Sequence, residues 1–349
     1  MKSLLVIGDS VVWGQGLAHE HKTASILAKH LGAEMNMLAH AGAKIGIHDS
    51  YTVTMPSAEV PCFFPTILQQ LEEFNGDPAA VQWMLMNGGI NDVEIQRVFN
   101  PMIPQYELEL HIRHYCGRDL LAILQLAAQK FPNARILVLG YYPPLSYLSR
   151  AEGVESLYSL VHGVKFAPLF HADLFRDQLV EHCLRFWKLS TGLFRSAVEH
   201  VNREAGAQRA IFVDSGLEEA NAAYAPQSLL WECETNDPAM APDDAVAERR
   251  VAYELVGAGD LQKNQVLLSA VGHPNITGAA RMAEQCLKAM AKGVVLNNLL
   301  PGGSKLTPRF ILRAWPTCLS LRMSITERSD CMFTLKRNGP FGEEPRLGT

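Results

Sequence analysis

Short apolar runs alternate along the chain with segments in which apolar positions recur at the period of a helix. The runs typical of strands are at 3–8, 35–40, 81–87, 134–142 and 209–214. The segments with helical periodicity are around 22–32, 65–75, 106–131, 173–206 and 275–293. Continuous apolar strands separated by helices predict an α/β fold with a parallel sheet that is covered on both faces.

The loops that follow the first three predicted strands carry polar and glycine-rich motifs. "GDS" follows the first strand, "HAGAKIG" the second and "NGGIND" the third. Ligands of parallel α/β sheets bind at the carboxyl ends of the strands. We therefore expect these three loops to converge in space, although they are far apart in the sequence.

Two insertions and a change of pattern interrupt this order. Residues 143–172 and 215–268 follow the fourth and fifth strands, and they either overhang the site or decorate the surface. Beyond 300 the apolar residues alternate with polar ones, with a turn signal at Asn338-Gly339-Pro340. We predict a main domain over 1–299 and a small β-rich appendage over 300–349, which docks on the main domain, pairs with another chain or begins a longer module.

Composition places the chain among soluble globular proteins. Of its 349 residues 48% are hydrophobic and 19% are charged, and the formal net charge is −5. This balance provides no basic field for a nucleic acid. No apolar run approaches the roughly 20 residues that span a bilayer. We expect no integral membrane segment.

Targeting signals and the spacing of the cysteines bear on the cellular compartment of the protein. A secretory signal would have to precede the first strand, which begins at about Ser3, so we predict a cytoplasmic protein and leave export by another route open. The seven cysteines lack C-x-x-C spacing, which indicates neither a zinc site nor a disulfide framework. The oligomeric state is left open by the sequence.

The polar motifs contain the parts of a serine hydrolase. A serine hydroxyl needs a base to take its proton and donors to bind the oxyanion. Ser10 stands at the end of the first strand with its own N–H, Gly42 allows a second N–H to approach, and Asn91 offers an amide. His273, just before the last helix, is the candidate base.

These motifs, in this order, resemble the SGNH hydrolases, also called the GDSL esterase and lipase family. The matching blocks are Gly8-Asp9-Ser10, Gly42, Gly89-Ile90-Asn91-Asp92 and His273-Pro274-Asn275. The resemblance covers about residues 1–295. It implies a flavodoxin-like three-layer α/β/α fold, an ester-cleaving serine that needs no metal or organic cofactor, and a shallow site open to varied acyl groups.

One position departs from the family's pattern. The resemblance implies an Asp three residues before the catalytic His, and this chain has Ala270 there. That acid would hold the imidazole tautomer and stabilise the imidazolium. Either a backbone carbonyl takes its place, as in a Ser-His dyad, or an acid of the second insertion does, such as Asp243, Asp244 or Asp260.

Plainer structural roles account for other polar residues. We interpret Asp9 as a supporting residue that binds backbone amides of its turn and holds Ser10 in place. His111 and His114 are three residues apart on a predicted helix, but no third ligand with metal-site spacing follows. They fit a partly exposed helix face better than a metal site.

The sequence therefore predicts a serine esterase that hydrolyses carboxylic esters of short- to medium-chain acyl groups through an acyl-enzyme on Ser10. Its partner would be a small-molecule ester. Deacetylation of a carbohydrate ester and cleavage of a thioester remain open, because both proceed through the same oxyanion. A non-catalytic ligand-binding protein on a degenerate hydrolase fold is the remaining alternative, and Ala270 is the feature in its favour.

Overall fold

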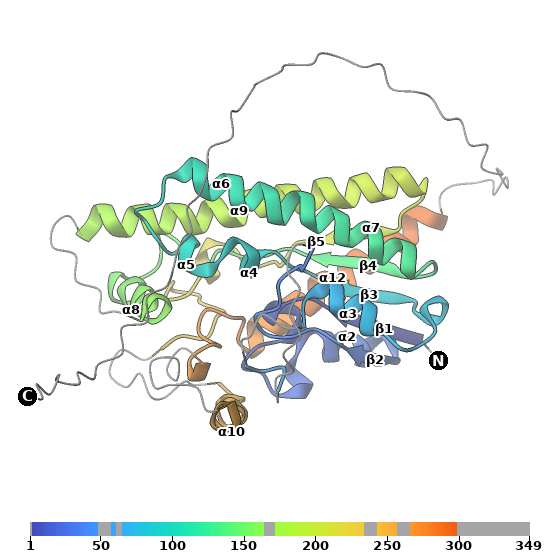
Figure 1. Cartoon of the computed structure of the whole chain (residues 1–349), viewed down its shortest axis with the longest axis horizontal. Coiled ribbons are helices and arrows are strands. Elements are labelled where there is room, and N and C mark those ends of the chain that lie inside the picture. Colours follow the sequence, from blue (N-terminus) through green and yellow to red (C-terminus); the bar gives the residue numbers. More distant parts are fainter. Residues whose placement is uncertain are drawn as a thin grey trace, which may run out of the picture. The chain divides into compact units, whose positions relative to one another are not determined.

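A single parallel sheet forms the centre of the protein. The computed structural model describes residues 2–47, 57–60, 65–163, 172–233, 243–256 and 266–298. Five strands lie in the order β2-β1-β3-β4-β5 (Figure 1), and all neighbours are parallel. The strands are β1 (Lys2–Ile7), β2 (Ala33–Met37), β3 (Trp83–Met86), β4 (Arg135–Leu139) and β5 (Ala210–Val213). This is the flavodoxin-like order, so the predicted fold class of the main domain is confirmed.

The interior strand β1 explains why strands of this sheet have continuous apolar runs. β1 lies between β2 and β3, with Val6 opposite Met37 on one side and Leu85 on the other. Leu4 to Ile7 are all fully buried, so both faces of the strand are covered. A strand with two covered faces needs apolar residues at every position rather than at every second one.

Helices form a layer on each face of the sheet (Figure 1). One layer consists of α3 (Ile67–Glu73), α6 (Gln105–Ile112), α7 (Leu120–Lys130) and α9 (Ala172–Ala205). The other consists of α2 (Thr23–Leu31) and α12 (Ile276–Asn298). All of these helices lie within or near the segments whose periodicity predicts them, except that the segment 106–131 is not one continuous α-helix.

A π-helical turn over Arg113–Asp119 separates α6 from α7. Within it Cys116 is fully buried, and its Sγ lies only 2.8 Å from where a Cβ on Gly89 would stand. The wider turn therefore packs directly behind the loop that follows β3. Hydrophobic periodicity cannot indicate such a turn, because it inserts a local shift into an otherwise continuous apolar stripe.

The shorter helices lie beyond the ends of the strands. α1 (Ser10–Trp13) follows β1, and α4 (Ile90–Val93) and α5 (Ile95–Val98) follow β3. The described parts of the two insertions contain α8 (Ala151–His162) and α10 (Val246–Val256). In Figure 1 the strands run from right to left, and α4, α5 and α8 lie to the left of the sheet. The predicted appendage at 300–349 lies outside the described residues and stays a prediction.

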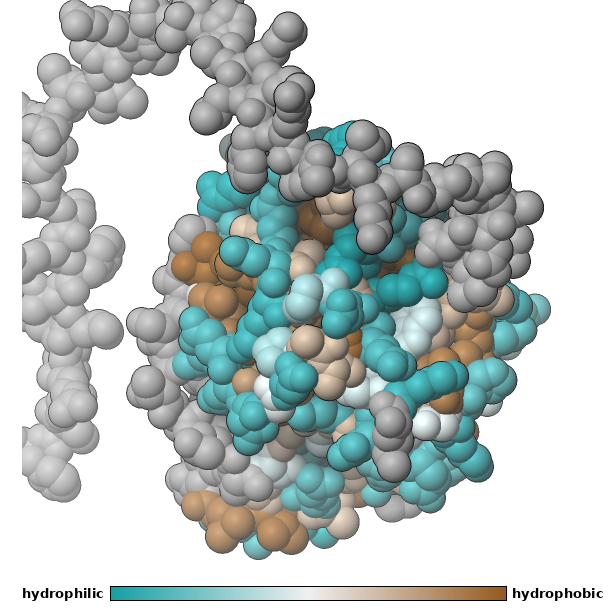
Figure 2. Space-filling view, turned by 90° about the vertical axis from the view of Figure 1, so that its right-hand side faces the viewer, coloured by the Kyte–Doolittle hydropathy of each residue, from teal (hydrophilic) through white to brown (hydrophobic). Residues whose placement is uncertain are grey.

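The face where the chain begins differs in character from the interior. Figure 2 turns toward the viewer the right-hand side of Figure 1, where β1 starts, and hydrophilic residues cover most of its coloured part, with smaller apolar areas between them. Within the portion of the chain that is described, no helix has the length and apolar character needed to cross a membrane.

Two glycine variants test how closely the turn after β1 is packed. Gly8 has a φ of 137°, and a Cβ there would lie 2.6 Å from Asn87 Oδ1 and 2.8 Å from the Asn87 carbonyl oxygen. Gly32 has a φ of 57°, and a Cβ there would meet nothing within 4 Å. We expect Gly32→Ala to lower the free energy of unfolding by about 1–2 kcal/mol, the cost of the left-handed conformation.

Gly8→Ala carries a steric conflict in addition, so we expect a loss of about 3 kcal/mol or more. Urea denaturation followed by circular dichroism measures both variants. Equal losses would contradict the close packing around Gly8.

Candidate active site

Ser10 and His273 are in contact although 263 residues separate them in the chain. After β1 the chain turns at Gly8 and Asp9, and Ser10 is the first residue of α1. Asp9, not Ser10, caps this helix, because its Oδ1 accepts a hydrogen bond from Val11 N at 2.9 Å. His273 Nε2 lies 2.8 Å from Ser10 Oγ. The structure thus joins the hydroxyl and imidazole that the sequence singles out.

One cavity of about 580 Å³ contains the contact, and residues from four loops line it. Ser10, Gly42, Asn91 and His273 all contribute to its wall. Asp9 is fully buried beneath the turn and is not part of the wall. The loops after the first three strands therefore converge, as the parallel sheet predicts.

The loop after β3 holds the loop after β2 in place. Asn91 Nδ2 donates to the Ala43 carbonyl at 2.9 Å, and the carboxylate of Asp92 accepts from Ile45 N at 3.1 Å. Gly42 directly precedes Ala43 and has a φ of 76°. A primary amide has two N–H donors, and the Ala43 carbonyl takes one of those of Asn91. The same bond that orients Asn91 leaves its second N–H for a ligand.

Tyr141 connects the turn that carries Asp9 and Ser10 to the loop after β3. Its hydroxyl donates to Asp9 Oδ2 at 2.6 Å and accepts from Ile90 N at 3.0 Å. Burial raises the pKa of Asp9, while the hydrogen bond from Tyr141 lowers it. No motif in the sequence singles out Tyr141. It belongs to a Tyr-Tyr pair at the end of the predicted run 134–142, which Gly140 separates from the end of β4.

Tyr142 connects the same end of β4 to the histidine loop, since its hydroxyl donates to the Gly272 carbonyl at 3.1 Å. On the other side, Trp231 N donates to the His273 carbonyl at 2.7 Å, and Gly272 N donates to the Trp231 carbonyl at 2.8 Å. The last helix, α12, begins at Ile276, and the side chain of Asn275 accepts from Gly278 N. Backbone contacts on both sides therefore fix the position of the histidine loop.

The imidazole of His273 is held in its neutral form. Burial lowers its pKa to about 4, and the positive charge of Arg249 lowers it further. The backbone carbonyls of Ala270, Val271 and Ser269 act in the opposite direction. A neutral ring with Nε2 facing Ser10 is the form that a general base requires.

No carboxylate among the described residues is hydrogen-bonded to His273, and Nδ1 has no well-directed partner there. Ala270 is fully buried, and its Cβ lies 2.5 Å from where a Cβ on Gly16 would stand. Asp243 binds Arg249, and Asp244 lies 3.6 Å from His21. Asp260 lies outside the described residues. Asp243 and Asp244 thus have partners other than His273, and the backbone-carbonyl alternative and Asp260 stay open.

Histidine, cysteine and acidic side chains among the described residues are the candidate metal ligands, and the cysteines are also the candidates for disulfides. Across the described ranges, no group of three His, Cys, Asp or Glu side chains is placed to hold a metal ion. The rings of His111 and His114 pack against Tyr115. The cysteines within these ranges are buried and free, namely Cys116, Cys183, Cys233 and Cys286.

No family model and no curated protein matches the sequence. Solved structures do match at low identity. Phospholipase A1 from Streptomyces albidoflavus NA297 is 12% identical, with 84% of this chain and 99% of that chain covered and a TM-score of 0.47. The extracellular lipase from Streptomyces rimosus is 13% identical, with 83% and 100% covered and a TM-score of 0.47.

A family two carbohydrate esterase from Clostridium thermocellum is also similar to this chain. The two are 13% identical, with 84% of this chain and 65% of that chain covered and a TM-score of 0.42.

The low pKa of His273 can be measured directly. In ring-labelled protein, NMR titration should show that His273 stays neutral as the pH falls through 6.5 and becomes protonated only near pH 4, because burial disfavours its charged form. Comparison with a His273→Gln sample assigns the signal. Protonation at or above pH 6.5 would contradict the buried, uncompensated environment of the ring.

Proposed function

We propose that this protein is a serine esterase that hydrolyses carboxylic esters through an acyl-enzyme on Ser10. The observation that carries the proposal is the 2.8 Å contact between Ser10 Oγ and His273 Nε2, in the wall of a cavity that Gly42 and Asn91 also line. A nucleophile paired with a neutral base, beside backbone and amide donors, is the arrangement that acyl transfer requires.

In the proposed mechanism, Ser10 Oγ attacks the ester carbonyl while His273 Nε2 takes its proton. The tetrahedral oxyanion is bound by the N–H groups of Ser10 and Gly42 and by the free N–H of Asn91. The N–H of Ser10 is suited to this, since N–H groups in the first turn of a helix have no partner within the helix. His273 then gives the proton to the leaving alcohol. Water, activated by the same imidazole, releases the acid and regenerates the serine.

The character of the cavity supports an apolar acyl group of short to medium length. Its volume falls in the range of small-molecule sites. Apolar side chains from α5, α8 and the loop that follows α5 make up much of the wall away from Ser10, namely Ile95, Phe99, Leu157, Leu160 and Val161. A carbohydrate ester or a thioester can pass through the same oxyanion. The apolar wall favours the simple acyl ester.

The chain-length preference of the purified protein tests this function. We expect hydrolysis of p-nitrophenyl acetate, butyrate and octanoate, and loss of that activity in Ser10→Ala. Each methylene that enters the apolar wall contributes about 0.8 kcal/mol, or about fourfold in kcat/KM, until the chain outgrows the cavity.

The other candidate activities have their own outcomes in this assay. If the protein hydrolyses an acetylated xylooligosaccharide or an acyl-thioester faster than p-nitrophenyl butyrate, the proposed substrate class is wrong and the proposed mechanism stands. Binding of these compounds without turnover, equal in the wild type and Ser10→Ala, would favour the non-catalytic alternative and overturn the enzyme.

The Asn91 amide has a matched control elsewhere in the chain. Asn133 also donates to a backbone carbonyl, that of Ala79 at 2.8 Å, but it lies outside the cavity wall. We expect Asn91→Ala to lower kcat about 10²- to 10³-fold, the cost of removing an oxyanion donor. Asn133→Ala should leave kcat within about twofold of the wild type, since it lies on the surface. Near-normal turnover of a folded Asn91→Ala protein would contradict the oxyanion role.

A further inference from the structure

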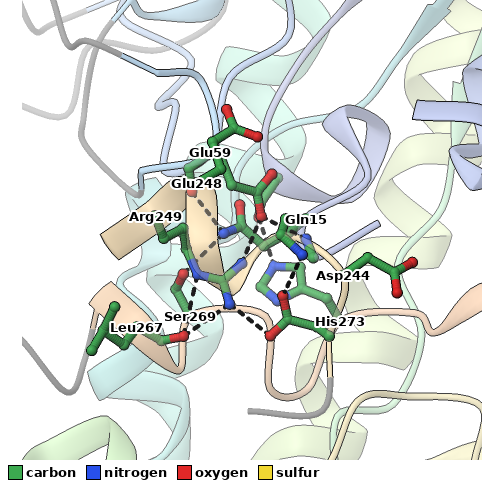
Figure 3. A network of polar contacts seen from close by, with 12 residues as sticks. Gln15, Glu59, Asp244, Glu248, Arg249, Leu267, Ser269 and His273 are labelled. Carbon is green, nitrogen blue, oxygen red and sulfur yellow. Dashed lines mark hydrogen bonds and ion pairs between the residues drawn. The ribbon is translucent and has the colours of Figure 1, made fainter. Parts of the chain in front are cut away.

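A buried cluster of charged side chains lies directly behind the histidine loop. Arg249, on α10, is completely buried, and the side chains of Glu59 and Asp243 are 1% exposed. Arg249 Nη1 lies 2.7 Å from Glu59 Oε1, and Nη2 lies 2.6 Å from Asp243 Oδ2. Figure 3 shows the guanidinium between Glu59 and the backbone carbonyl of Leu267, with His273 nearby.

The cluster makes direct contact with the chain that leads to His273. Arg249 Nε and Nη2 both donate to the Leu267 carbonyl, at 3.2 and 2.8 Å. Gln15 Nε2 donates to Ser269 Oγ at 2.9 Å and also to the Glu59 carbonyl at 2.8 Å. The loop over 267–273 is therefore attached at two points before it reaches the imidazole.

The cluster is tied equally to the turn that carries Ser10. Glu59 accepts from Gly16 N at 2.7 Å and from Trp13 Nε1 at 2.7 Å, so it holds the end of α1 and the residues after it. Lys22 Nζ lies 4.0 Å from Glu59, and burial lowers the pKa of this lysine to about 8. One set of ion pairs thus connects the segment that bears the nucleophile to the segment that bears the base.

Stability alone does not account for this arrangement. The desolvation of buried ions offsets much of their attraction, and replacement of such a cluster by apolar residues is often neutral or stabilising. The cluster instead fixes the positions of the chain segments that it contacts. A guanidinium offers N–H donors in a fixed planar fork, which can bind two carboxylates and a carbonyl at defined angles.

We propose that Arg249 is a positioning residue for His273: its hydrogen bonds to the Leu267 carbonyl, with the Gln15–Ser269 contact, set the loop so that Nε2 of the imidazole faces Ser10 Oγ. In this way the cluster takes over the orienting task of the acid that Ala270 replaces. The proposal rests on the proposed function of Ser10 and His273. Arg249 touches neither substrate nor reacting atoms and acts through the loop.

The chemistry of the ring agrees with this assignment. A neutral ring that carries its proton on Nδ1 leaves the Nε2 lone pair for the Ser10 hydroxyl. A positive charge behind the loop cannot stabilise an imidazolium as a carboxylate would. Arg249 in fact lowers the pKa of His273, and the carbonyls of Ser269, Ala270 and Val271 raise it.

The test uses Arg249→Lys in the full chain, because lysine keeps the charge between the two carboxylates and loses the fork. Arg250→Lys is the matched control, since Arg250 is the next residue of α10 and is exposed. For each protein, thermal melting establishes folding, kcat and KM are measured on the ester, and the His273 ring is titrated by NMR. The charged groups around the loop are Arg249, Glu59, Asp243 and Lys22. The hydroxyls of Ser10 and Tyr142 are the neutral polar groups that contact it.

We expect Arg249→Lys to lower kcat about 10- to 100-fold with KM nearly unchanged, because small displacements of a reacting group have effects of this size. The pKa of His273 should rise by about one unit or more as the ring gains water. Arg250→Lys should change neither quantity. A folded Arg249→Lys protein with wild-type kcat and an unchanged His273 titration would overturn the proposal and leave Arg249 as a structural ion pair.

Ser269→Ala keeps the ion pairs intact and covers the case in which Arg249→Lys does not fold. We expect it to lower kcat about threefold to tenfold, since it removes one of the two attachments of the loop. No change in kcat or in the His273 titration would overturn the proposal. If the wild type itself shows no turnover, the proposed function fails, and the NMR titration still decides whether Arg249 sets the ring.

Discussion

The site depends on one hydrogen bond between two ends of the folded domain, from Ser10 beside the first strand to His273 before the last helix. No residue adjacent in sequence to Ser10 or to His273 fixes the distance between their side chains. The parallel sheet brings the loops to one edge, but a hydrogen bond of 2.8 Å requires finer control than strand packing gives. That control comes from buried polar side chains, each of which ties one loop to another. Tyr141 joins the nucleophile turn to the Asn91 loop, Tyr142 holds the histidine loop, and Asp92 holds the loop of Gly42.

The electrostatics of the site follow from what surrounds the imidazole. Because the ring is buried, with the Ser10 hydroxyl at Nε2 and the positive charge of Arg249 behind the loop, its neutral form is strongly favoured. Its pKa in the folded state, about 4, lies below the value of an unfolded histidine. The stability that this burial contributes is therefore present above about pH 6.5 and is lost as the pH falls toward 4. The same environment keeps the base available at mildly acidic pH and makes it a weak one.

Much of the architecture could be predicted from the sequence, because β1, β3, β4 and β5 are largely buried apolar runs and the helices that form the two layers have a clear period. The edge strand β2 is partly exposed and carries polar residues. The sequence could also select Ser10, Gly42, Asn91 and His273, since each belongs to a short motif beside a predicted element. It could not reveal the residues that join these motifs. Glu59 is 190 residues from Arg249 in the chain, and Asp243, six residues before Arg249, has no motif spacing to it. An isolated arginine on a short amphipathic helix is usually interpreted as a solvated residue. The π-helical turn at Cys116 was hidden in the same way, because the apolar stripe continues through it.

The central claim of the proposed function is that the Ser10 hydroxyl is reactive because His273 accepts its proton. A fluorophosphonate that forms a stable adduct only with an activated serine tests this directly, with mass spectrometry of the digested protein to locate the adduct. We expect one adduct, on the peptide that contains Ser10. This adduct should be absent in Ser10→Ala and should form far more slowly in His273→Ala. An unmodified wild-type protein, or labelling that persists in both variants, would contradict the claim.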